Sequence, residues 1–341
     1  MGYYAQSISG HLDLVGRAKP VPQWLEAADT PEALKERLRL SQRMRDFAVD
    51  TLHLPNNDSY RLYADLQRPS AVWNVVAAPP LSLKLQTWCF PVMGCVGYRG
   101  YFHQADAEAY AEQLRQQGLE VLVYGVTAYS TLGRLPGGLS SDPLLNTFIR
   151  FPEGELARMI FHELAHQVAY ANNDTVFNES FATAVERLGG EQWLQQHASP
   201  AARAEYQRAN ERREAFRALT GRYRDRLQAL YQGPGSDEEK RAGKAALMGD
   251  LRSDHEQLKR NAWGGYAGYD HWFERANNAS FGVLSAYNAL VPQFERLFER
   301  QGRDFKRFYA EVQRLAALPG AERHAALAAA VAVASKPELA H

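Results

Sequence analysis

The stretch IFHELAHQVAYANNDTVFNESFATAVE, from Ile160 to Glu186, constrains this chain more than any other part of its sequence. Histidine and glutamate side chains stand there in a frame that is otherwise apolar or small, which predicts a buried helix. Pro152 in a first-turn position, with acidic residues after it, predicts where that helix begins. The Asn172–Asp174 cluster predicts its end, and a second, antiparallel helix is expected to begin near Asn178.

His162 and His166 are four residues apart, so both imidazoles face the same way on a helix. Two neutral imidazoles in this position can bind one metal ion. Glu163 can then reach a water on that ion without binding the metal itself. This is the H-E-x-x-H arrangement of zinc proteases, and it predicts Glu163 as the general base.

Zinc at a catalytic site takes three protein ligands and keeps a fourth position for water. The returning helix offers Glu179, so the expected ligands are His162, His166 and Glu179. Glu186, seven residues further along the same face, is expected to accept the free ring N–H of His162 and fix its tautomer. An isolated H-E-x-x-H arises by chance, but the apolar frame, the break and the N-E-x-F-A segment together are much more specific.

We divide the chain into an α+β lobe, residues 1–150, and a helical lobe, residues 151–341. In the first lobe Thr30-Pro31 opens a helix, and the segment 106–118 predicts another. Runs of apolar and β-branched residues predict strands at 70–80, 81–90 and 120–131.

In the second lobe the metal helices are expected at 152–190. The charged and periodic segment at 199–260 predicts an antiparallel helical hairpin, with a capping box formed by Ser236 and Glu239. Two or three further helices are expected over 270–335. The predicted fold class is α+β, with a small mixed sheet packed on a mainly helical C-terminal part.

The charge balance argues against some classes of partner, although it leaves local basic patches possible, such as the run from Arg203 to Arg226. The chain has 341 residues, with 39 Lys and Arg against 39 Asp and Glu, so its formal net charge is zero. Such a chain has no global field that attracts nucleic acid or an anionic membrane. No apolar run approaches the roughly 18 residues that a transmembrane helix needs. We therefore expect no nucleic-acid partner and no transmembrane span.

Cys89 and Cys95 are the two cysteines, six residues apart, with Pro91 and Gly94 between them. This spacing suits a small disulfide loop in an oxidising compartment. It also allows two buried thiols near a turn, and the spacing alone leaves both open.

The motifs carry a family resemblance. HELAH followed by NESFATAVE resembles the gluzincin metallopeptidases, whose alanyl-aminopeptidase branch has an N-E-G-F-A segment and a glutamate two turns later. The gap between the motifs is shorter here than in that branch. The wider chain resembles a bacterial family described as predicted aminopeptidases. The segments that carry this likeness, from residue 2 to residue 281, are GYYAQSISGHLDL, TWCFPVMGCVGYRGYF, GVTAYSTLGRL, DPLLNTF, HELAHQ, NESFATAVE and NNASF.

The resemblance implies a zincin-like metallopeptidase that hydrolyses peptide bonds at peptide N-termini. Glu163 would take a proton from the zinc-bound water and pass it to the leaving amine. A tyrosine often stabilises the oxyanion in the resembled enzymes, and Tyr287 is preferred here over Tyr269 and Tyr266. An edge strand usually aligns the substrate in zinc peptidases. The strand at 120–131 would do so here, and Tyr129 to Gly133 would border the cleft.

Members of the resembled family tend to begin with a lipoprotein-type signal. The resemblance therefore implies a periplasmic location and a lipid anchor in the full-length precursor. This chain would then be a mature form without its leader and with an added Met1. A periplasmic location would also suit a disulfide between Cys89 and Cys95.

Two alternative functions stay open. The chain acts as an endopeptidase, or it is a zinc-stabilised binding protein that hydrolyses nothing. An aminopeptidase needs carboxylates to hold the α-ammonium group of its substrate, and the sequence does not reveal which acidic residues line a cleft. Glu163 argues against the binding protein, because a purely structural zinc site does not need that residue.

Overall fold

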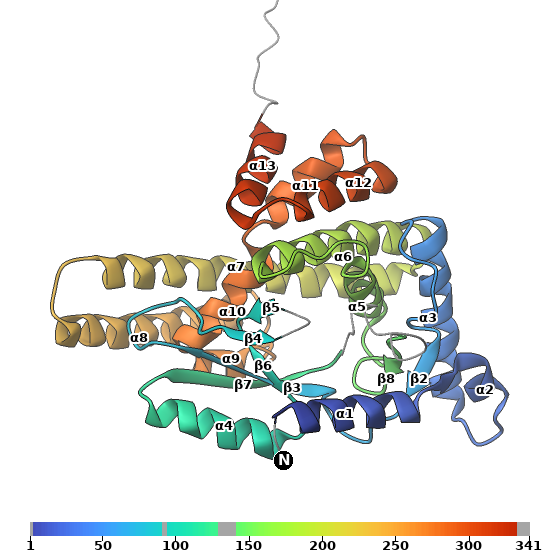
Figure 1. Ribbon diagram of the computed structural model, residues 1–341, viewed down its shortest axis with the longest axis horizontal. Coiled ribbons are helices and arrows are strands. Elements are labelled where there is room, and N and C mark those ends of the chain that lie inside the picture. The colour runs from blue at the N-terminus through green and yellow to red at the C-terminus, as the bar shows by residue number, and fades with distance from the viewer. Residues whose placement is uncertain (1–2, 91–93, 129–140, 333–341) are drawn as a thin grey trace, which may run out of the picture.

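A computed structural model describes residues 3–90, 94–128 and 141–332, with their side chains except those of residues 5 and 286–288. The described chain is mostly helical with small sheets, which confirms the predicted α+β class (Figure 1).

The elements up to residue 150 are α1 (Tyr3–Arg17), β1 (Lys19–Pro20), α2 (Val21–Glu26), α3 (Glu32–Asp50), β2 (Leu62–Ala64), β3 (Val72–Ala78), β4 (Trp88–Phe90), β5 (Gly94–Val96), β6 (Arg99–Tyr101), α4 (Gln104–Gln116), β7 (Glu120–Val126) and β8 (Leu144–Leu145). The later elements are α5 (Glu153–Ala165), α6 (Thr175–His197), α7 (Pro200–Gln232), α8 (Asp237–Asn261), α9 (Asp270–Arg275), α10 (Asn278–Asn288), α11 (Val291–Arg300), α12 (Phe305–Ala316) and α13 (Gly320–Ala332).

One three-stranded sheet has the strand order β6-β3-β7, and β3 pairs antiparallel with both neighbours. Every residue of β3 is buried, because α4 covers one face of the sheet and α10 packs on the other (Figure 1). On its far side α10 packs against α6. The order of layers is therefore α4, the sheet, α10 and α6.

The strand predicted at 81–90 is largely wrong, since only β4 at its end is a strand. β7 occupies one edge of β3 along its whole length, and β6 pairs with Trp73–Val75 on the other edge. Beyond β6, the Ala77 carbonyl accepts a hydrogen bond from the N–H of Gln86 at 2.8 Å, so this segment meets the edge of β3 without forming a strand. Leu83 and Leu85 instead pack beside α10, where a Cβ at Gly282 would lie 2.5 Å from Leu85 Cδ2. Burial against a helix therefore accompanies this one backbone contact with β3.

The helical predictions fare better. The hairpin at 199–260 is confirmed as α7 and α8, and the capping box of Ser236 and Glu239 is present. Five helices, and not two or three, lie between residues 270 and 332. The helix α1 was not predicted. Within the described ranges no helix combines the length and apolarity needed to cross a membrane.

One core surrounds the helix that carries the histidines. Residues on every side of α5 are buried, as expected for a central helix. The main cluster joins Leu14 and Tyr60 from the first predicted lobe to Phe161 and Phe294 from the second. It therefore crosses the boundary expected at residue 150.

The turn between α5 and α6 is closed by side chains. Asn178 accepts a hydrogen bond from the backbone N–H of Ala171 at 2.7 Å and donates to the Ala171 carbonyl at 2.9 Å. Asp174 caps α6 by accepting from the N–H of Phe177 at 3.0 Å. α5 thus ends at Ala165 and α6 begins at Thr175, earlier in both cases than predicted. The buried Asn178 fixes the chain one residue before Glu179.

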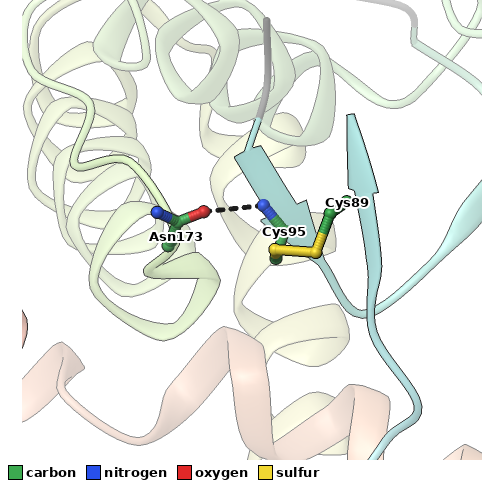
Figure 2. The surroundings of a disulfide bond; sticks show 3 residues. All are labelled: Cys89, Cys95 and Asn173. Carbon is green, nitrogen blue, oxygen red and sulfur yellow. Dashed lines mark hydrogen bonds between the residues drawn. A yellow bond between two sulfur atoms is a disulfide. The ribbon is translucent and has the colours of Figure 1, made fainter. Parts of the chain in front are cut away.

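A disulfide joins Cys89 and Cys95, directly opposite each other on β4 and β5, so the first of the two alternatives is confirmed (Figure 2). The backbone N–H of Cys95 donates to Asn173 Oδ1 at 2.7 Å. Asn173 itself has a φ of 63°, in the left-handed region that asparagine tolerates. The cross-linked hairpin is thereby bound to the turn that precedes Glu179.

Candidate metal centre

Three side chains from the α5–α6 pair converge. His162 lies in the last turn of α5, His166 follows as its C-terminal cap residue, and Glu179 comes from the second turn of α6. The Nε2 atoms of the two histidines lie 3.2 Å apart. Glu179 Oε2 lies 3.3 Å from Nε2 of His162 and 3.6 Å from Nε2 of His166. The structure therefore brings together all three predicted ligands.

This donor set fits zinc. Two ligand atoms at about 2.1 Å from a tetrahedral ion are about 3.4 Å apart, close to the three separations given above. Two imidazole nitrogens that face each other this closely, beside a carboxylate, need a proton or a metal cation between them. Both histidines are buried, so water cannot readily take that role.

Glu186 lies where the sequence predicted it. Its Oε2 atom is 2.9 Å from Nδ1 of His162, and its Oε1 atom accepts a hydrogen bond from Arg158. Arg158 reaches this position beneath Gly190, where a Cβ would lie 2.9 Å from Arg158 Cγ. With Nδ1–H donated to Glu186, Nε2 of His162 is left free to bind a metal.

Burial alone would lower the pKa of His162, but its bonds to Glu179 and Glu186 hold that pKa well above the usual value. Burial would raise the pKa of the Glu179 carboxyl, yet His166 and His162 lower it to about 2. Arg158 and His162 likewise outweigh burial and lower the pKa of Glu186. Without an ion, a proton on His162 thus balances the carboxylates of Glu179 and Glu186, and a bound metal cation would take the place of that proton.

Glu163 shares the site without pairing with any of these groups through a hydrogen bond. Burial raises the pKa of its carboxyl above the usual value, although the nearby His162 and His166 oppose the rise. A carboxylate with a raised pKa is a better proton acceptor, which suits a general base.

A family model described as "Putative aminopeptidase" matches residues 2–327. The chain belongs to this family. The resemblance noted in the sequence is confirmed at that level, and membership in an aminopeptidase family supports a peptidase-like function. No curated protein and no solved structure matches the chain.

The structure does not test every tyrosine that the resemblance implied. The side chain of Tyr287 and the residues from Tyr129 to Gly133 lie outside the part of the chain that the structure describes. Tyr269 stacks on Phe216 of α7, with ring centroids 4.5 Å apart. Tyr266 is exposed. Neither Tyr266 nor Tyr269 lies in the layer of side chains between the sheet and the metal helices.

Two other tyrosines lie in that layer. Tyr98, between β5 and β6, and Tyr124, on β7, pack with Ala279 of α10. Burial, followed by the carboxylate of Glu179, raises the pKa of Tyr98 well above its usual value, and Glu163 adds to the rise. Burial and Glu179 also raise the pKa of Tyr124, to about 12. Sequence reasoning missed both, although the apolar alternation of β7 predicted a strand with Tyr124 on one of its faces.

A second group of side chains that could hold a metal ion comprises His255, Glu256 and Asp270. The ammonium group of Lys259 lies against both carboxylates, 3.8 Å from Glu256 and in a hydrogen bond with Asp270. A fixed positive charge in that position repels a divalent cation. We therefore expect metal at the first group and not at this one.

Proposed function

We propose that this chain is a zinc-dependent peptidase with a zincin-like catalytic core, and that it removes residues from the N-termini of peptides. His162, His166 and Glu179 would hold the zinc. One observation carries the proposal: these three donors converge at zinc-like separations, and the Glu163 carboxyl lies near both histidines and Glu179. Membership in an aminopeptidase family supports the peptide substrate.

Bound zinc would act as a Lewis acid that polarises the scissile carbonyl and lowers the pKa of the attacking water. Glu163 accepts a proton from that water as it attacks the carbonyl carbon. The same carboxyl then delivers the proton to the leaving nitrogen as the C–N bond breaks. Glu186 keeps the ring of His162 in one tautomer throughout, and Arg158 holds Glu186 in place.

The oxyanion that forms on the carbonyl oxygen needs a hydrogen-bond donor. We propose Tyr98 for this role as an alternative to Tyr287. Tyr98 is close enough to Glu179 and Glu163 that both carboxylates raise the pKa of its hydroxyl group. Tyr98→Phe is expected to lower kcat by about 10²–10³-fold, the cost of one oxyanion donor, with zinc content unchanged. Steady-state kinetics of Tyr98→Phe and Tyr287→Phe decide between them. A kcat of Tyr98→Phe within threefold of the parent value would remove Tyr98 from the mechanism.

We expect the enzyme to require a free α-amine on its substrate. The ammonium group of a peptide N-terminus would pair with a buried carboxylate through a strong, charge-assisted bond. Acetylation removes this charge, so acetylated peptides should not be turned over. The measurement is a panel of aminoacyl and N-blocked peptides, with and without a chelator.

Three other outcomes of that panel would contradict parts of the proposal. Internal cleavage of acetylated peptides at comparable rates would make the chain an endopeptidase. Hydrolysis that survives complete removal of zinc would contradict metal dependence. Zinc binding without hydrolysis of any peptide would favour the non-catalytic binding protein.

We further propose a periplasmic location, with a lipid anchor in the full-length precursor. The disulfide of Cys89 and Cys95 supports the first part, because disulfides are rare in the reducing cytosol. The lipid anchor rests on the family resemblance alone.

A further inference from the structure

A small pocket of about 70 Å³ opens between α7 and α10, apart from the three metal-binding side chains. Arg217, Arg224 and Thr220 line it from α7, and Phe281 and Ser285 from α10. Cations and hydroxyl groups thus share its wall with one aromatic ring. This combination suits an anion that is attached to an apolar or peptide body.

Arg217 differs from the other arginines nearby. Arg158 is paired with Glu186, Arg187 with Glu295 and Arg213 with Glu155. Arg217 has no ion pair within the described residues, and its buried Nη1 nitrogen has no hydrogen-bond partner there. A guanidinium group carries five N–H donors, so the Nη1 hydrogens of Arg217 are available to a ligand, whereas the other arginine of the pocket, Arg224, is paired with Asp225.

The charge on Arg217 is also poorly compensated. Burial, followed by the neighbouring Arg187, Arg158 and Arg213, lowers the pKa of Arg217 to about 10. The nearby carboxylate of Glu186 opposes them. An anion bound in the pocket would offset this local excess of positive charge.

The pocket lies close to the metal helices. The charge of Glu186 acts on the pKa of Arg217, and the same carboxylate bonds to His162. The helix α10, which forms one wall of the pocket, packs on α6, the helix that carries Glu179. We propose that the pocket binds a carboxylate of the peptide substrate, with the guanidinium group of Arg217 donating to its oxygens. This inference rests on the proposed function. The carboxylate is the C-terminal one of a short peptide or that of an acidic side chain.

The test measures binding and not turnover. Zinc-loaded Glu163→Gln protein is titrated by calorimetry with a free-acid tripeptide, with its C-terminal amide, and with an amide whose third residue is glutamate. A charge-assisted bidentate contact predicts about 10- to 100-fold tighter binding of the free acid than of the plain amide. Tight binding of the glutamate amide as well would assign the site to acidic side chains. Equal affinities of all three peptides, or no binding of any, would overturn the inference.

Arg217→Met in the same background should abolish the difference between acid and amide. Arg217→Lys, which keeps the charge without the planar fork, should restore part of it. Arg222→Met is the matched control, because Arg222 lies on the same helix, is exposed and is paired with Asp254. Thermal melting checks that each variant is folded. Hydrolysis plays no part in this readout, so a chain that discriminates acid from amide but cleaves nothing would contradict the proposed function and leave this inference standing.

Discussion

Glu163→Gln is expected to lose peptide hydrolysis by several orders of magnitude while it keeps its fold and its zinc. General-base catalysis alone contributes about 10²–10⁴-fold, and the same carboxyl also protonates the leaving amine. Glutamine has nearly the same shape as glutamate but cannot accept the proton. Because Glu163 accepts no hydrogen bond from the proposed ligands, the substitution should leave their positions unchanged.

The measurement is kcat on an aminoacyl substrate, with zinc content and thermal melting determined on the same preparation. Gln167→Glu is unsuitable as a control, since Gln167 donates to Ser59 and Asp142. Glu191→Ala is a better one, because this exposed residue is outside the metal centre. Activity of Glu163→Gln within tenfold of the parent protein would defeat the proposed mechanism.

Glu179→Ala is expected to lose most of its zinc. The substitution removes one of three protein ligands and leaves two histidines, which together bind zinc weakly at neutral pH. Glu186→Ala should have a smaller effect, about 10–100-fold in zinc affinity, because Glu186 orients His162 and does not reach the ion. The same substitution leaves the buried Arg158 without its partner Glu186, so the melting temperature of the Glu186→Ala protein should also fall.

Zinc titration of both variants beside Glu191→Ala separates the two roles. We expect zinc affinity to be highest in Glu191→Ala, lower in Glu186→Ala and lowest in Glu179→Ala. If Glu186→Ala lost zinc completely and Glu179→Ala retained it, the assignment of the third ligand would be wrong.

Local sequence predicted the metal helices well. The apolar frame of 160–186 and the polar break at 172–174 suffice to predict two antiparallel helices with His162, His166 and Glu179 facing each other. The prediction succeeded because the contacts are between neighbouring segments, and because Asn178 closes the turn within seven residues of Ala171.

Long-range packing limited the rest. Tyr98 and Tyr124 lie between the β6-β3-β7 sheet and the helix pair α5–α6 because α10, more than 150 residues later in the chain, packs on that sheet. The segment 81–87 has the composition of a strand, but its Leu83 and Leu85 pack beside α10, a helix that lies about 200 residues later in the chain. The unpaired state of Arg217 depends on where the carboxylates of α5, α6 and α11 lie. None of these facts is encoded in a local pattern.

The central claim is a zinc ion between α5 and α6. Its most direct test is a crystal of the zinc-loaded protein measured at the zinc absorption edge. We predict one anomalous peak per chain, at about 2.0–2.2 Å from Nε2 of His162, Nε2 of His166 and a carboxylate oxygen of Glu179. A peak among His255, Glu256 and Asp270, with none between the two helices, would contradict the account.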